Sequence, residues 1–421
     1  MIKMMRRSIF AVATILILIL SYSSLGEHEV ASIGKIKPYW VKTYGGDGDD
    51  IAKCVDAYGD VVYVAGETSS GDATKIFLLK YTSKGRFQWN VSLDGSVVKD
   101  IVVYGDAIYV LGEIDETGNK NVFVSKVSSD GNIVWTKTWG GSSEDIAGGI
   151  VAKGNAIYIC GETKSFGALG SDVFIAKYDL DGNFVWQKLW GRSGNEGGYD
   201  ILSTNDGVCV VGYTTSYGAG EKDVLVLKFD FDGNIVWTKT WGGSSEDIAM
   251  KITSLDEFYV LGYTASYFPH ALLLKYDGQG NMLFERRWGE SEEDIAEDIA
   301  TSSDAIFIVG KTAQGWGGDI FLLKYTSEGI LRFAKTWGGF REDAAYGIDI
   351  DGSVMYIVGY TTERATAKDA FILKCNLYGV RSISIEKTGI INNEAISVFG
   401  REVFPLLEKT DSSSTTAALS L

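Results

Sequence analysis

The stretch DGNIVWTKTWGGSSEDIA, residues 130–147, decides the fold because it returns letter for letter as residues 232–249. The two copies lie 102 residues apart, and a weaker copy stands midway between them. The first aromatic residue of the pattern falls at seven places, at intervals of 46 to 51 residues: Trp40, Trp89, Trp135, Trp186, Trp237, Phe284 and Phe333. Self-similarity at a fixed period of this length is typical of repeat architectures. We therefore expect seven copies of one structural unit.

Each unit reads as four short β-strands. AIYIC (residues 156–160) and DVFIAKY (residues 172–178) have the period of two that strands show. The following Asp-Gly-Asn, residues 181–183, suits a tight hairpin because Gly and Asn accept positive φ. No helix-length amphipathic segment interrupts the pattern. We predict an all-β fold, a seven-bladed β-propeller with four antiparallel strands per blade, with a solenoid as the alternative.

The repeat also resembles a known family. Its signature, W-x-K-x-WGG-x-x-ED-I-A followed by YVxGYT and D-x-FLLKY-x-x-x-G, is similar to the SBBP-type β-propeller repeat of exported bacterial and archaeal proteins. The resemblance covers about 340 of the 421 residues and recurs seven times. It implies a propeller outside the cell or at its surface. It implies no catalytic residues, since that family as a whole has none established.

The order of the strands leaves the closure of the ring open between two segments. We take the segment after GGxxED as the innermost strand of each blade and the tryptophan strand as the outermost. The last blade then lacks an outermost strand, which either Trp40–Tyr44 or Ile383–Lys387 could supply. We favour the N-terminal segment because WVKTYGG matches the repeat better than ISIEKTG. The predicted propeller spans residues 38–388, and residues 389–421 form a Ser/Thr-rich tail expected to be flexible.

Residues 1–26 read as an export signal. A positive start, MIKMMRR, precedes a 13-residue apolar run and a small-x-small site at Ser24-Leu25-Gly26, which is the order of a signal peptide. The alternative is an uncleaved anchor, because residues 8–25 are just long enough to span a bilayer. Either reading places the protein outside the cell, secreted or at the cell surface. Contact with a membrane is expected only through this segment if it stays uncleaved.

Composition excludes one class of partner. The formal net charge is −16, and no basic cluster exists beyond the N-terminus, so nucleic acid is not expected to bind. Fifty-one glycines and three prolines suit many strands joined by tight turns. Cys160 and Cys209 stand where other repeats have apolar or aromatic residues, so we interpret the cysteines as core residues.

The tryptophans form a regular stripe. Ten of the eleven occupy two positions, four apart, in the outermost strands, and residues four apart in a strand face the same side. Aromatic stripes can bind sugars, but such regularity favours packing between blades. The Asp-x-Asp-Gly-Asn turns resemble part of a calcium loop, yet Trp190 and Trp241 stand where that loop needs a glutamate.

Acids occupy one repeat position between the outermost strand of one blade and the innermost strand of the next: Asp50, Asp145, Glu196, Asp247, Asp294 and Asp343. The favoured interpretation is that each accepts backbone N–H bonds and fixes its turn. The alternative is a ring of carboxylates near the axis that holds a hard cation such as calcium. The metal hypothesis rests on Asp145, Glu196, Asp247, Asp294 and Asp343. No other cofactor is expected.

Aromatic side chains mark one face as a candidate binding surface. Strand directions alternate, so the loops that carry the acids emerge on the same face as the longest loops, between the second and third strands. Those loops carry Phe166, Tyr217 and Tyr267 at matching places, and the next carries Trp316. Exposed aromatics rimmed by acids are typical of contact surfaces. The alternative is that each side chain packs on its own loop.

These patterns favour a non-catalytic extracellular propeller that binds a protein, a glycan or a cell-envelope partner, and we expect a monomer. One histidine in the whole propeller, and acids explained by the repeat, argue against an enzyme. The alternative is a propeller enzyme acting on an extracellular polysaccharide. A passive spacer that holds another domain away from the membrane is the third hypothesis.

Overall fold

The computed structural model describes residues 38–70, 73–116, 118–266, 270–289, 294–312, 318–338, 341–362 and 367–377. The export signal, the Ile383–Lys387 segment and the tail lie outside these residues, so their assignments stay predictions. The described residues contain no helix that could span a membrane.

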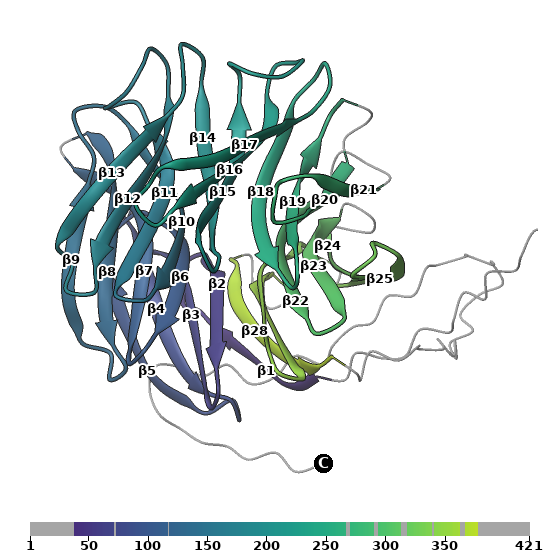
Figure 1. The fold of residues 1–421 in the computed structure, drawn as a ribbon. Coiled ribbons are helices and arrows are strands. Elements are labelled where there is room, and N and C mark those ends of the chain that lie inside the picture. The colour runs from purple at the N-terminus through teal and green to yellow at the C-terminus, as the bar shows by residue number, and fades with distance from the viewer. Residues whose placement is uncertain are drawn as a thin grey trace, which may run out of the picture. The chain divides into compact units, whose positions relative to one another are not determined.

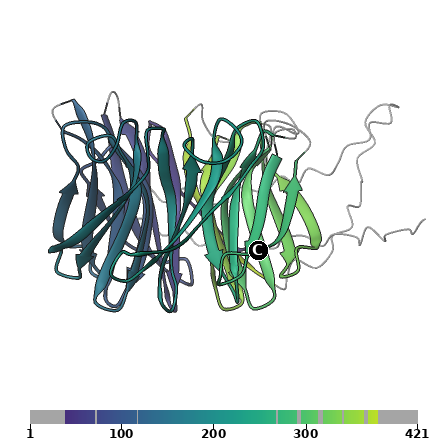
Figure 2. The same cartoon turned by 45° about the horizontal axis from the view of Figure 1, so that its top comes forward.

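Within the described residues, the strands form seven sheets of four antiparallel strands each, which confirms the seven-bladed β-propeller (Figure 1). Figure 2 shows the strands running from one face of the ring to the other. Blades 1 to 3 consist of β2 (Asp50–Tyr58), β3 (Val61–Ser70), β4 (Ala73–Thr82) and β5 (Phe87–Leu93), then β6 (Val97–Tyr104), β7 (Ala107–Glu116), β8 (Asn119–Ser128) and β9 (Ile133–Trp139), then β10 (Asp145–Lys153), β11 (Ala156–Thr163), β12 (Asp172–Asp179) and β13 (Phe184–Trp190).

Blades 4 to 6 repeat this order with β14 (Glu196–Ser203), β15 (Gly207–Thr214), β16 (Asp223–Asp230) and β17 (Ile235–Trp241), then β18 (Asp247–Ser254), β19 (Phe258–Thr264), β20 (His270–Tyr276) and β21 (Met282–Trp288), then β22 (Ile295–Ser302), β23 (Ala305–Thr312), β24 (Asp319–Thr326) and β25 (Leu331–Trp337). Blade 7 consists of β26 (Asp343–Asp351), β27 (Val354–Thr361), β28 (Asp369–Asn376) and β1 (Pro38–Tyr44).

The ring closes through the N-terminal strand, as the better match of WVKTYGG predicted. β1 pairs antiparallel with β28, with Trp40 opposite Lys374 and Tyr44 opposite Ala370. Blade 7 therefore takes three strands from the end of the propeller sequence and its outermost strand from the beginning. This joining of both ends in one sheet leaves β28 with a partner on each side, and an unpaired strand edge would invite aggregation.

The middle strands of each blade are buried on both faces, because each sheet is packed between two others. All eight residues of β11 are buried, and so are seven of the eight in β16. These strands therefore read as nearly continuous apolar runs rather than as strict alternation. The four cysteines are free thiols buried in this interior, as the repeat positions indicated.

The tryptophan stripe packs between neighbouring blades. Trp139 and Trp337 are buried, and the other eight of these tryptophans are half-buried. Trp89 shows the recurring contact: its ring covers Gly131 in the hairpin of the next blade, and its Nε1 donates to Ser129 O at 3.1 Å. Gly131 has φ of 87°, and a Cβ there would lie about 3.0 Å from the indole. Glycine is therefore required both by the turn and by the tryptophan above it.

Candidate functional site

The two sets of loops that the sequence places on one face do meet there. In blade 3 the loop after Thr163 is bonded to the turn before Asp145, since Lys164 N donates to Glu144 O at 3.0 Å. Blade 4 repeats the contact with Thr215 N and Asn195 O at 2.9 Å. We call this face the loop face.

The acids of the loop face cap their own turns. Asp145 is fully buried, and its carboxylate accepts from Gly141 N at 2.8 Å, Ser165 Oγ at 2.7 Å and Thr163 Oγ1 at 2.5 Å. Glu196, in the same position of blade 4, accepts from Arg192 N at 2.9 Å. These bonds hold the turn into the innermost strand, which is the favoured interpretation of the repeated acids.

The remaining members of the set are buried at the same place in their blades. Asp247 accepts from Gly243 N and Asp50 from Gly46 N, each at 2.8 Å, and Asp294 and Asp343 are 3% and 5% exposed. Among the described residues, no three His, Cys, Asp or Glu side chains converge as metal ligands would. The calcium hypothesis for Asp145, Glu196, Asp247, Asp294 and Asp343 remains a prediction.

The structure contains a second set of buried acids that were not among the candidates from the sequence. Asp172 begins the third strand of blade 3, and its Oδ2 accepts from Ala168 N at 2.6 Å; Asp223 does the same with Ala219 N at 3.0 Å in blade 4. Burial, followed by repulsion from Glu196, raises the pKa of Asp172. A Cβ on Gly191 would overlap Asp172 Oδ1, so the glycine after the tryptophan makes room for this acid. In the sequence, these acids could have been found as the Asp at the start of DVFIAKY and DVLVLKF.

Two of the four candidate aromatics lie in described residues. Phe166 is 36% exposed and contacts Trp139 with ring centroids 5.5 Å apart; Tyr217 is 37% exposed and lies 5.4 Å from Trp190. Each therefore rests on the outermost strand of the preceding blade rather than on its own loop. Tyr267 and Trp316 lie outside the described residues, so their place in the surface stays a prediction.

Aspartates of the innermost strands form hydrogen-bonded bridges between blades, which the repeat pattern did not single out. Asp100, Asp200 and Asp298 each follow a β-bulge in blades 2, 4 and 6. Each carboxylate accepts one N–H of its own strand and one N–H of the next blade. The bonds between blades join Asp100 to Ile150, Asp200 to Ile252 and Asp298 to Ile348 at 2.8 to 3.0 Å. The visible signal was an Asp before Ile in alternate repeats.

Lys251 of blade 5 balances the charge of these bridges. Burial alone would lower the pKa of Lys251, but the carboxylates of Asp200, Asp298 and Asp100 outweigh it and hold that pKa above its ordinary value. Burial in turn raises the pKa of all three acids, although Lys251 opposes the shift. Through these hydrogen bonds the charged cluster links the innermost strands of neighbouring blades.

Comparison with known proteins identifies no family for this chain. No protein-family model and no curated protein match this chain. Among solved structures, the β-propeller domain of the Trilobed protease from Pyrococcus furiosus covers 78% of this chain and 98% of its own, with 10% identity and a TM-score of 0.47. The phage phi92 endosialidase covers 87% and 71%, with 9% identity and a TM-score of 0.44. A protein of unknown function from Bacteroides caccae covers 65% and 92%, with 10% identity and a TM-score of 0.43.

Proposed function

We propose that this chain is a non-catalytic extracellular β-propeller that binds a protein, a glycan or a cell-envelope partner through its loop face. The resemblance to the SBBP-type repeat and the export signal at residues 1–26 support a location outside the cell. The buried acids support a binding role rather than a catalytic one, because Asp145, Glu196 and Asp172 already accept hydrogen bonds from backbone N–H groups.

The observation that carries the proposal is the way Phe166 and Tyr217 are held. Each ring rests on a tryptophan of the neighbouring blade, yet more than a third of each side chain stays exposed. A ring that is already ordered loses little conformational entropy when a partner covers it. Aromatic anchors of this kind contribute much of the affinity of many interfaces.

The test is retention of the purified protein by washed cell envelopes of the source organism. We expect the wild-type protein to be retained, and the double variant Phe166→Ala with Tyr217→Ala to lose most of that retention. Tyr58→Ala is the matched control, because Tyr58 is 72% exposed at the end of β2, on the opposite face. Equal retention of the double variant and the wild type, at equal melting temperature, would overturn the assignment of the loop face.

A further inference from the structure

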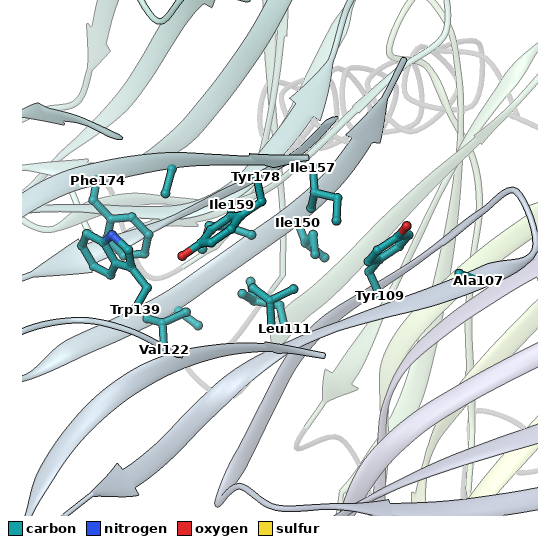
Figure 3. Packing of buried hydrophobic residues seen from close by; sticks show 13 residues of the cluster. Ala107, Tyr109, Leu111, Val122, Trp139, Ile150, Ile157, Ile159, Phe174 and Tyr178 are labelled. Carbon is teal, nitrogen blue, oxygen red and sulfur yellow. The ribbon is translucent and has the colours of Figure 1, made fainter. Parts of the chain in front are cut away.

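A groove opens at the outer edge of the ring between blades 2 and 3. Its volume is about 470 Å³, and it reaches from Gly140 and Phe166 on the loop face to Asn183 and Phe184 at the opposite turn. Its inner wall includes Trp139, which stacks on Phe174 with centroids 3.8 Å apart (Figure 3). The wall is thus a packed part of the core, and the groove is a preformed surface of the fold.

The next two wedges along the ring have the same framework, but an arginine covers each. Between blades 3 and 4, the Arg192 guanidinium lies 4.9 Å from the ring of Tyr217. Between blades 4 and 5, Arg287 lies 5.9 Å from Trp241. At the corresponding positions of the groove stand Gly141, in place of Arg192, and Leu189, in place of Arg287. Gly141 keeps the WGG of the repeat, so Arg192 and Arg287 are the departures from it, and the groove is open because no arginine stands at either position.

Gln187 gives the groove an oriented polar group. The indole N–H of Trp139 donates to Gln187 Oε1 at 3.0 Å, and because an indole nitrogen only donates, the amide oxygen must face it. Both N–H groups of Gln187 Nε2 are left over, and they have no hydrogen-bond partner among the residues that the structure describes. The next blades have Thr238 and Glu285 at this position, so the glutamine is particular to this groove.

The lining has the composition of a site for an amphipathic ligand. Phe184, 52% exposed, and Phe166 supply apolar surface, while Gln187, Asn183 and Lys137 supply polar groups. The described residues that line the groove include no Asp or Glu, and the nearby carboxylate of Asp179 accepts a hydrogen bond of 2.8 Å from Asn183 Nδ2. A pyranose sugar has this same division into an apolar C–H face and a rim of hydroxyls, and small-molecule sites combine apolar walls with a few placed polar groups.

We propose that this groove binds a short run of pyranose units of an extracellular polysaccharide. One sugar lies with its apolar face on Phe166 and another on Phe184, at the two ends of the groove, and their hydroxyls lie against Gln187 Nε2 and Asn183. Lys137, exposed at the groove, adds the charge that would favour a carboxylate-bearing sugar over a neutral one. The inference rests on the proposed binding function and gives that function a ligand class.

The test is titration of the purified full-length protein with three probes, followed by saturation-transfer NMR and calorimetry. The probes are a neutral hexopyranose tetrasaccharide, a uronic acid tetrasaccharide and a short peptide rich in Leu and Phe. We expect a tetrasaccharide to bind, and tighter binding of the uronate that weakens in salt would identify an acidic sugar. Binding of the peptide alone, or of none of the three, would overturn the sugar assignment.

Two variants show whether the sugar binds in the groove. Gln187→Ala should weaken sugar binding about tenfold, which corresponds to about 1.4 kcal/mol. In the wedge between blades 4 and 5, Glu285 accepts from Trp241 Nε1 at 3.2 Å and forms an ion pair with Arg287 at 2.7 Å. The double change Gln187→Glu with Leu189→Arg recreates this pair in the groove, so it should abolish binding without unfolding the protein. Thr238→Ala, at the same position of the neighbouring wedge, is the matched control and should bind normally. Undiminished binding by the closed double variant would place the sugar elsewhere.

The outcome of this experiment can be distinguished from the outcome of the envelope-retention test. If the protein is retained by cell envelopes but binds neither tetrasaccharide, the sugar inference is wrong and the binding function stands. If it binds a tetrasaccharide through Gln187 but is not retained by envelopes, the sugar inference stands and the envelope is not the partner.

Discussion

Asp200, in the innermost strand of blade 4, accepts a hydrogen bond of 2.8 Å from the backbone N–H of Ile252, in the innermost strand of blade 5. No ladder joins one blade to the next among the sheets of the described residues, so the blades depend on side chains for such links. A buried N–H left without an acceptor costs free energy. The aspartate bridge is thus a specific bond in a joint that otherwise relies on apolar packing.

Asp200→Ala should destabilise the protein by about 1–3 kcal/mol, because it leaves the N–H groups of Ile201 and Ile252 without their acceptor. Urea unfolding followed by tryptophan fluorescence measures this change. Asp304→Ala, in an exposed turn, is the control and should stay within about 0.5 kcal/mol of the wild type. Equal stability of the two variants would mean that water or a neighbouring group replaces the carboxylate.

Stability should depend on pH through the same residue. Burial raises the pKa of Asp200 in the folded state, with Asp100 adding to the shift and Lys251 opposing it. The folded protein therefore binds more protons than the unfolded chain above about pH 4, so this group's contribution to the free energy of unfolding falls as pH rises toward neutrality. We expect Asp200→Asn to show a smaller loss of stability than the wild type between mildly acidic and neutral pH. An identical pH profile for both proteins would contradict this.

Removal of residues 38–44 should open the ring. Without β1, the edge of β28 loses its hydrogen-bonded partner and exposes a strand buried on both sides, which favours association between molecules. The measurement is size-exclusion chromatography with light scattering, together with the melting temperature. A chain truncated only to residue 36 is the control. A monomer of unchanged melting temperature would show that another segment closes the ring.

Chelation of calcium should leave the melting temperature unchanged. Asp145 and Glu196 already accept hydrogen bonds from their own turns, and a metal that bound only the folded state would raise its stability. Thermal unfolding in EDTA and in millimolar calcium tests this expectation. A rise in melting temperature with calcium that Asp145→Asn removes would instead support the carboxylate ring as a metal site.

The buried and the half-buried tryptophans of the stripe should contribute differently to the free energy of unfolding. Trp337 is 6% exposed, and its replacement by alanine should cost roughly 3–5 kcal/mol, as for other buried large aromatics. Trp237 is half-buried, so Trp237→Ala should cost less. Denaturant unfolding of the two variants under the same conditions gives the comparison. Equal losses would mean that the exposed edge of Trp237 contributes as much as buried surface does.

The repeat was enough to predict the number of blades, the four strands in each, the hairpins and the contact stripe of tryptophans. These features depend on local chemistry that each repeat carries in full: the period of two in the strands, Gly and Asn in the turns, and Trp at two fixed positions. The closing strand was also predictable, because β1 keeps the pattern of the other outermost strands. The acids that cap the turns were visible for the same reason.

The bonds that join neighbouring blades and the position of the groove, by contrast, appear only in the folded structure. The bond between Asp200 and Ile252 links residues 52 positions apart, and the Asp before Ile in one repeat does not show which N–H of the next blade it meets. The groove is lined from two blades, with Trp139 on one side and Gln187, which differs from its counterparts in the other repeats, on the other side. Such features arise from pairs of side chains brought together across a wedge, so they become visible only when the register of one blade against the next is known.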